Sequence, residues 1–202
     1  MSHFFAYLSR MKHIQRWGLM RNNRQENIQE HSLQVAMVAH ALALIHNRRF
    51  GGRVGADRVA VLAMFHDASE VITGDLPTPV KYFNDSIRES YKAIEREAED
   101  RLLEMLPEEM REDYRTLLPE DAPDADQQRL IKAADAVCGY LKCVEEEESG
   151  NAEFSQARRV LAEKIERLEM PEVDYFMETF APSFSLTLDE LNAPTTRRGR
   201  GD

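Results

Sequence analysis

Apolar residues recur at helical spacing along most of the chain. In the stretch EHSLQVAMVAHALALI, residues 30–45, positions His31, Val35, Val38, Leu42 and Ile45 follow one another at steps of four and three. Such steps place side chains on one face of an α-helix, so the pattern predicts a helix whose buried face begins with an imidazole. A histidine at that position requires a buried partner from elsewhere in the chain.

The same periodicity predicts an all-α protein, because no segment shows sustained alternation of apolar and polar residues with turn signals at strand spacing. Asn27, with Glu30 three positions on, fits a capping box, and Gly150 fits the end of a helix. The expected helices are Phe4–Gln15, Gln29–His46, Ala56–Ser69, Ser86–Met105, Glu108–Leu117, Asp126–Glu148, Asn151–Leu168 and a short helix that begins at Val173.

Length and composition predict one domain. The chain has 202 residues, of which 43% are hydrophobic, and this is enough for a substantial core. The stretch LPEDAPDADQQ, residues 118–128, is interpreted as a connector inside the domain, because the helices on both sides need each other's apolar faces. Residues 192–202 have nothing to bury, so we expect a disordered tail after a domain that spans residues 1–191.

Charge and hydropathy exclude several classes of function. A formal net charge of −10 argues against binding to a nucleic-acid polymer, which requires a basic face. The sequence has no signal-peptide core and no run of about 18 apolar residues, so we expect no membrane association. Only two cysteines occur, Cys138 and Cys143, without further ligands for zinc nearby. They are expected to pack in the core of a cytoplasmic protein.

Candidate chemistry concentrates in HDASEVITGDLPTP, which follows a buried helical pattern. On a continuous helix, the adjacent His66 and Asp67 and the following Glu70 can face one region. Asp135 lies beside the apolar stripe of a later helix, where a carboxylate is desolvated and needs a partner. Together with His31, these residues supply two imidazoles and two carboxylates on core-facing surfaces. A divalent metal satisfies all four at once.

Each of these residues alone has a simpler interpretation. A lone buried histidine is more often a hydrogen-bonded core residue than a ligand, and a lone buried aspartate usually caps a helix or pairs with an arginine. The conjunction of His31, His66-Asp67 and Asp135 favours a metal site instead. Glu70 alone could be a solvated residue at a helix end, but its place beside the histidine-aspartate pair favours a catalytic role.

This H…HD…D pattern resembles that of the HD-domain metal-dependent phosphohydrolases, an all-α superfamily. The stretches SHFFAYLSRMKHIQRWGLMRNNRQENIQEHSLQVAMVAHALALI, LAMFHDASEVITGDLPTPVKYFN and KAADAVCGYLKCVEE are similar to the bacterial 5′-deoxynucleotidases of that superfamily, over nearly the whole chain apart from the tail. The resemblance implies a single helical bundle with a divalent metal site between helices. It also implies removal of the 5′-phosphate from deoxyribonucleoside 5′-monophosphates.

The expected metal ligands are His31, His66, Asp67 and Asp135. Four ligands leave positions on an octahedral cation free for water and for a phosphate oxygen, as in a catalytic site. The mixed nitrogen and oxygen donors fit one Co²⁺ or Mn²⁺ ion best, and Zn²⁺, Ni²⁺, Fe²⁺ or Cu²⁺ are compatible with them.

The stretch QRWGLMRNNR precedes the first ligand and supplies cations for a dianionic phosphate. By resemblance Arg16 orients the phosphate, a task that suits a bidentate guanidinium. Trp17, the only tryptophan, is assigned the exclusion of a 2′-hydroxyl; the alternative is that it only packs the first helix. The loop GDLPTP completes the pocket in this interpretation, with Gly74 for a tight turn. The expected substrate contacts are Arg16, Trp17, His31, Asp75, Leu76, Pro77 and Thr78.

Several questions stay open from the sequence. Glu70 could align or deprotonate the attacking water, or pass a proton to the leaving 5′ oxygen. The metal cluster could hydrolyse another phosphoester, such as a cyclic or signalling nucleotide, or the chain could be a regulatory module that keeps the pocket. No base-reading set is evident, so low base selectivity is expected. The acidic run Glu145–Glu148 is interpreted as a solvated helix end. The stretch VDYFMETFAPSFSLTL either covers the core or forms a homodimer interface, which we favour.

Overall fold

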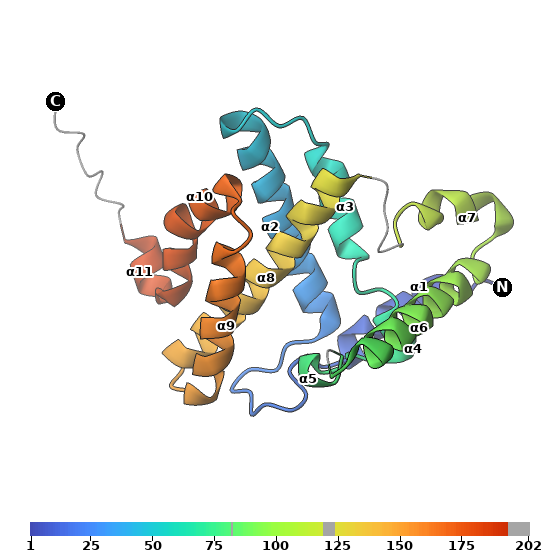
Figure 1. The fold of residues 1–202 in the computed structure, drawn as a ribbon, viewed down its shortest axis with the longest axis horizontal. Helices are drawn as coiled ribbons and strands as arrows, with labels where there is room; N and C mark the ends of the chain where they lie inside the picture. Colours follow the sequence, from blue (N-terminus) through green and yellow to red (C-terminus); the bar gives the residue numbers. More distant parts are fainter. Residues whose placement is uncertain (82, 119–123, 194–202) are drawn as a thin grey trace.

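The computed structural model describes residues 1–81, 83–118 and 124–193. Within these ranges the chain consists of helices joined by turns and loops, with one isolated β-bridge, which confirms the all-α prediction (Figure 1). The helices are, in chain order, α1 (Phe4–Leu8), η1 (Ser9–His13), α2 (Ile28–Arg49), α3 (Ala56–Met64), α4 (Glu70–Thr73), α5 (Thr78–Lys81), α6 (Asp85–Glu104), α7 (Glu108–Arg115), α8 (Ala125–Glu148), η2 (Ala152–Phe154), α9 (Ser155–Glu166), α10 (Pro171–Thr179), η3 (Ala181–Ser185) and α11 (Leu188–Asn192), the η elements being 3-10 helices.

The main hydrophobic core forms where α2 crosses α8 (Figure 1). Helices α3 and α10 pack against α2, and α9 packs against α8. The apolar stripe predicted for residues 30–45 is buried here: Val35 and Leu42 are fully enclosed, and His31 at its head is equally inaccessible. The stripe of α8 is buried against it, through Leu130, Ala134, Val137, Leu141 and Val144. Both cysteines are buried and unbonded, as predicted for core packing.

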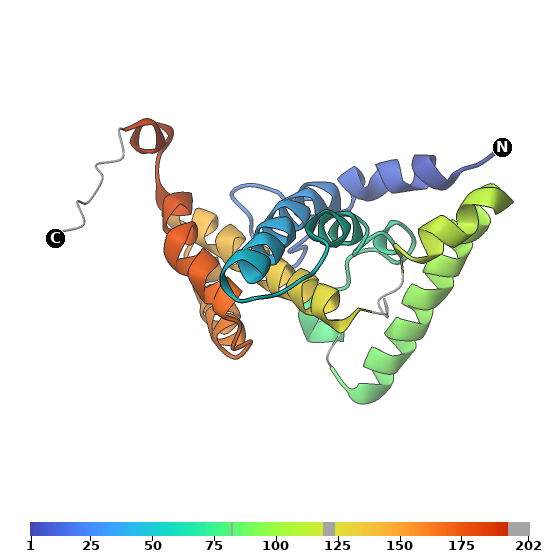
Figure 2. The same ribbon diagram turned by 90° about the horizontal axis from the view of Figure 1, so that it is seen from above.

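A second, smaller core lies under α6, which projects with α7 to one side of the molecule (Figures 1 and 2). Phe4 of α1 and Leu102 of α6 are buried in it. The segment after α3 connects the two cores, because Ala63 belongs to the first and Ala68 to the second. The residues between them are therefore held at the junction of the two cores.

This junction contains the clearest error of the sequence interpretation. The predicted helix Ala56–Ser69 is wrong, because α3 ends at Met64 and α4 begins only at Glu70. The imidazole of His66 explains the break: its Nδ1 lies 2.7 Å from the carbonyl oxygen of Ala63, which also accepts the His66 backbone N–H at 3.4 Å. The side chain thus forms a hydrogen bond with a carbonyl oxygen that would accept a backbone N–H if the α-helix continued.

Other differences are smaller. The predicted helix Phe4–Gln15 ends in the 3-10 turn η1, and Gln15 instead forms the β-bridge with Asn27. The side chain of Asn27 accepts the Glu30 N–H at 3.0 Å, as expected of an N-cap. Helices α5 and α11 were not predicted. Residues 119–123 of the predicted connector and residues 194–202 of the predicted tail lie outside the described residues. No described helix is both long and apolar enough to cross a bilayer.

The acidic run at the end of α8 is not uniformly solvated, which corrects the prediction at Glu146. This side chain is 2% exposed and pairs with Lys142, one turn earlier and 4% exposed. Its carboxylate also accepts the backbone N–H groups of Asn23 and Arg24, at 2.9 and 3.1 Å. Lys142 in turn donates to the carbonyl oxygen of Arg24. The pair therefore attaches the segment before α2 to α8.

Removing one member of this pair should destabilise the protein. Lys142→Met is expected to lower the free energy of unfolding by about 3–5 kcal/mol, because the Glu146 carboxylate stays buried without its cation. The matched control is Arg167→Met, which breaks the exposed ion pair with Glu163 on α9. This variant should change the free energy of unfolding by less than ~1 kcal/mol. Urea denaturation of both variants measures the difference, and equal losses would contradict a structural role for the buried pair.

Candidate metal centre

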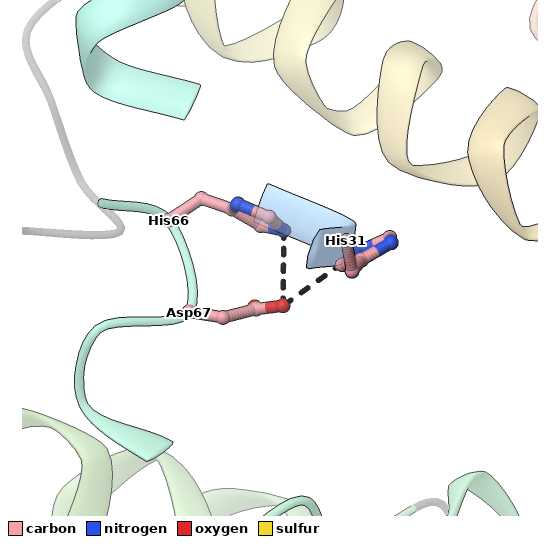
Figure 3. Close-up of side chains that lie close together, drawn as sticks. All are labelled: His31, His66 and Asp67. Carbon is pink, nitrogen blue, oxygen red and sulfur yellow. Dashed lines mark ion pairs between the residues drawn. The ribbon is translucent and has the colours of Figure 1, made fainter. Parts of the chain in front are cut away.

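Three ligand atoms converge at the junction of the two cores. His31 comes from the first turn of α2, and His66 and Asp67 come from the turn between α3 and α4 (Figure 3). Their ligand atoms lie within 4.8 Å of one another. The Oδ2 atom of Asp67 is 3.0 Å from Nε2 of His66 and 3.8 Å from Nε2 of His31. Two nitrogens and one oxygen at such spacing can share a divalent cation.

Asp135 approaches the same site from α8. Its Oδ1 atom lies 3.2 Å from Nε2 of His31, although it does not belong to the group of three mutually close ligands. Its side chain is 39% exposed, so this carboxylate is desolvated only in part. Partial burial opposes ionisation of Asp135, but the adjacent His31 and His66 hold its pKa well below the usual range. A negative charge is therefore maintained beside the three ligands.

His66 has the orientation that a metal ligand requires. Its Nδ1 faces the Ala63 carbonyl oxygen, so Nε2 is directed at the site, where it is buried 3.0 Å from Oδ2 of Asp67. A carbonyl bonded to the remote ring nitrogen is a typical support for a ligating histidine. Burial alone would lower the pKa of His66, but Asp67 and Asp135 raise it to about 9. A cation that replaces this proton would satisfy the same carboxylates.

His31 is the most enclosed of the ligands, with a side-chain exposure of 0%. Burial and the guanidinium of Arg16 both lower its pKa, so the ring is neutral, as a ligand must be. Arg16 Nη1 lies 2.7 Å from Nδ1 of His31 and 2.6 Å from Oε2 of Glu26. The guanidinium of Arg16, which is predicted to bind the phosphate, thus lies directly beside the metal-ligand cluster.

Glu70 lies at the start of α4, one turn beyond the histidine-aspartate pair. It is 9% exposed and its Oε2 atom has no hydrogen-bond partner. Burial, together with the nearby Asp67 and Asp75, raises the pKa of Glu70 to about 10. Without a cation in the site, this carboxyl therefore holds a proton at neutral pH. The structure does not place Glu70 at a solvated helix end.

Trp17 lies in the loop between η1 and α2, outside the first helix. Its ring contacts Phe154 of η2, with centroids 5.3 Å apart, and its backbone is left-handed, with φ of 59°. Its Nε1 donates to Glu26 Oε2 at 3.2 Å. The sequence interpretation missed Glu26, which is buried here, because a glutamate in the polar stretch RNNRQEN gives no periodic signal.

The predicted GDLPTP loop is partly helical. Gly74 caps α4 with φ of 75°, but Thr78 already begins α5 and is exposed. Asp75, Leu76 and Pro77 between them are half-buried. Burial raises the pKa of Asp75, and the charge of Arg16 opposes this shift. The hydroxyl of Tyr91 donates to the Gly74 carbonyl oxygen at 3.2 Å and connects this segment to α6.

Comparison with known proteins gives a consistent result. The model of the family described as 5′-deoxynucleotidase YfbR-like matches residues 3–184. The chain is 58% identical over 192 residues to the 5′-deoxynucleotidase of Yersinia pestis (strain Pestoides F), covering 95% of this chain and 98% of the relative. The 5′-deoxynucleotidase of Yersinia pseudotuberculosis serotype O:3 (strain YPIII) matches with the same values.

Solved structures share the fold. An HD-domain phosphohydrolase from Listeria innocua superposes with a TM-score of 0.79 at 25% identity, over 90% of this chain and 88% of that one. The cyanophage S-2L HD phosphohydrolase, solved with dA and one catalytic Zn²⁺ ion, superposes with a TM-score of 0.60 at 22% identity, over 90% of this chain and 96% of that one.

Proposed function

Since the chain belongs to the family of YfbR-like 5′-deoxynucleotidases, we propose that it hydrolyses deoxyribonucleoside 5′-monophosphates to deoxyribonucleosides and phosphate, with little selectivity for the base. The chain is accordingly a phosphoric monoester hydrolase. The observation that carries the proposal is the convergence of His31, His66 and Asp67 within 4.8 Å, beside a partly buried arginine and a buried carboxyl group.

We propose that His31, His66, Asp67 and Asp135 hold one divalent cation. The direction of His66 Nε2 towards Asp67, 3.0 Å away, and the charge of Asp135 support this assignment. A bound cation supplies positive charge to the phosphate oxygens and makes water more acidic. The mixed nitrogen and oxygen donors favour Co²⁺ or Mn²⁺ among the divalent metals.

Glu70 is assigned the proton transfers. A positive charge beside Asp67 would counter the effects that raise the pKa of Glu70, so its carboxylate could accept a proton. In the reaction, the oxygen of a water molecule bonds to phosphorus, the bond from phosphorus to the 5′ oxygen breaks, and that oxygen gains a proton. Glu70 can take the proton from water and deliver it to the leaving oxygen.

Arg16 and Trp17 are assigned to the phosphate and the sugar. The position of Arg16, 3.9 Å from Asp135 and 2.7 Å from His31, supports contact with a phosphate in front of the ligands. Trp17 is the next residue in the chain after Arg16, and its ring contacts Phe154. We assign it the exclusion of a 2′-hydroxyl. Asp75, Leu76, Pro77 and Thr78 are proposed to complete the pocket.

Sugar discrimination tests this function. The wild type should hydrolyse dAMP much faster than AMP, and Trp17→Ala should narrow the ratio of the two kcat/KM values by about tenfold, because the wall against the hydroxyl is lost. Arg16→Ala should lower both values together through lost phosphate alignment. Phosphate release from both nucleotides measures the ratio. An unchanged ratio in Trp17→Ala would move the discriminator elsewhere, with Asp75 and Thr78 as the next candidates.

We further propose that the enzyme is a cytoplasmic homodimer. Part of the aromatic stretch near the C-terminus covers the core, since Val173 and Phe176 are buried there. Other apolar side chains of this region remain exposed, including Leu186 at 43% and Leu188 at 74%. Exposed apolar residues in one region are typical of a subunit interface, which supports the proposal.

A further inference from the structure

Glu26 is a buried carboxylate for which the reaction described above has no use. Its exposure is 8%, and it lies at the end of the loop that leads from η1 to α2. Its backbone carbonyl oxygen accepts the Arg16 N–H at 2.9 Å, next to the bridge between Gln15 and Asn27 that closes the base of the loop. A carboxylate is unfavourable in such a place unless specific partners satisfy it.

A single oxygen of this carboxylate serves two side chains. Oε2 of Glu26 accepts from Nη1 of Arg16 at 2.6 Å and from Nε1 of Trp17 at 3.2 Å. The guanidinium carbon of Arg16 lies 5.8 Å from the centre of the Trp17 ring. The side chains assigned to the phosphate and to the sugar are thus both oriented from one atom.

The Trp17 ring also contacts Phe154. Its backbone adopts a left-handed conformation that L-residues rarely take, so the chain does not favour this arrangement locally. The ring contacts Phe154, which is fully buried, and the planes of the two rings are tilted by 59°. The contact with Phe154 limits the tilt of the ring, and the bond from Nε1 to Glu26 fixes its rotation within the loop.

We propose that Glu26 is a positioning residue that determines sugar selectivity, by holding the Trp17 ring at a fixed place relative to Arg16. The proposal rests on the proposed function, because it assigns Trp17 and Arg16 to the substrate. Hydrogen bonds to a carboxylate are stronger than those between neutral groups, so Glu26 suits this task. Without it, the ring can turn away from the 2′ position and Arg16 loses one of its fixed contacts.

Kinetic measurements on dAMP and AMP test the proposal. Glu26→Ala should lower kcat/KM for dAMP and narrow the dAMP/AMP ratio by about tenfold, which a single hydrogen bond to a charged group can supply. Glu26→Gln keeps the side-chain volume and one acceptor, so it should fold normally and show an intermediate ratio. The matched control is Glu30→Gln, which removes an exposed carboxylate four residues away and should leave the ratio unchanged.

A double-mutant cycle isolates the bond itself. Trp17→Phe removes the Nε1 donor and shortens the ring, so it should narrow the ratio in the wild-type background. In the Glu26→Ala background Trp17→Phe should narrow the dAMP/AMP ratio much less, because the hydrogen bond between Trp17 Nε1 and Glu26 is already absent. Equal effects of Trp17→Phe in both backgrounds would contradict the proposed coupling.

Fluorescence provides a readout that does not depend on activity. Trp17 is the only tryptophan, so its anisotropy decay in the metal-free protein reports the mobility of this ring alone. Glu26→Ala should increase that mobility and Glu30→Gln should not. An unchanged dAMP/AMP ratio with unchanged Trp17 mobility in both Glu26 variants would overturn the proposal. A wild type without deoxynucleotidase activity would refute the proposed function, whereas the fluorescence would still show whether Glu26 orients Trp17.

Discussion

His66→Ala is expected to abolish phosphatase activity at ordinary metal concentrations. Loss of an outer-shell partner of a metal ligand typically reduces metal affinity or activity 10–100-fold, so loss of the ligand itself should cost more than about 100-fold. Chelation of the wild type should have the same effect, and added Co²⁺ or Mn²⁺ should restore the wild type but not the variant. Metal content and phosphate release from dAMP, measured side by side, check the result.

His40→Ala is the matched control for this experiment. His40 lies on α2, like His31, but it is partly exposed and faces Asp57 at 3.3 Å, away from the ligand cluster. This variant should bind metal and hydrolyse dAMP as the wild type does. Full activity of chelated wild-type protein, or of His66→Ala, would contradict the metal centre.

Glu70→Gln should reduce kcat on dAMP by roughly 10²–10⁴, the usual contribution of a general acid or base. Glutamine has nearly the shape of glutamate but cannot exchange the proton, so metal content and nucleotide binding should be preserved. Isothermal titration with dAMP and metal analysis distinguish this result from loss of a ligand.

The corresponding control is Glu89→Gln, a change of an exposed glutamate on α6 that should leave kcat unaltered. If Glu70→Gln loses its metal together with its activity, Glu70 is a ligand and the proton transfers belong to another group. If kcat is unchanged, the buried carboxyl has no chemical role.

The all-α fold and the places of the long helices could be predicted from the sequence because their apolar periods are long and regular. The stripe from His31 to Ile45 is buried as predicted. The end of α3 could not be predicted, because it depends on the contact of the His66 ring with the Ala63 carbonyl oxygen, a tertiary arrangement in which the side chain competes with the helix. The spacing of apolar residues alone does not indicate that the His66 side chain will compete with the helix for this carbonyl oxygen.

The candidate ligands were accessible to sequence reasoning for a similar reason. His31, His66 and Asp67 lie together in the structure, and each stands at the end of an apolar pattern with a group that needs a partner. Glu26 interrupts no pattern, since its neighbours are polar, and it becomes buried only because the loop folds back between η1 and α2. The same holds for Glu146, whose partners at Asn23 and Arg24 are distant in the chain.

The attachment of the loop before α2 to the end of α8 also has a consequence for the order of folding. Glu146 and Asn23 are separated by 123 positions, and His31 and Asp135 by 104. Contacts between such distant positions form late, because the chain between them must be closed first. During synthesis, α2 and α3 are complete long before α8 emerges from the ribosome. A nascent chain therefore carries three of the four candidate ligands before Asp135, on α8, can join them.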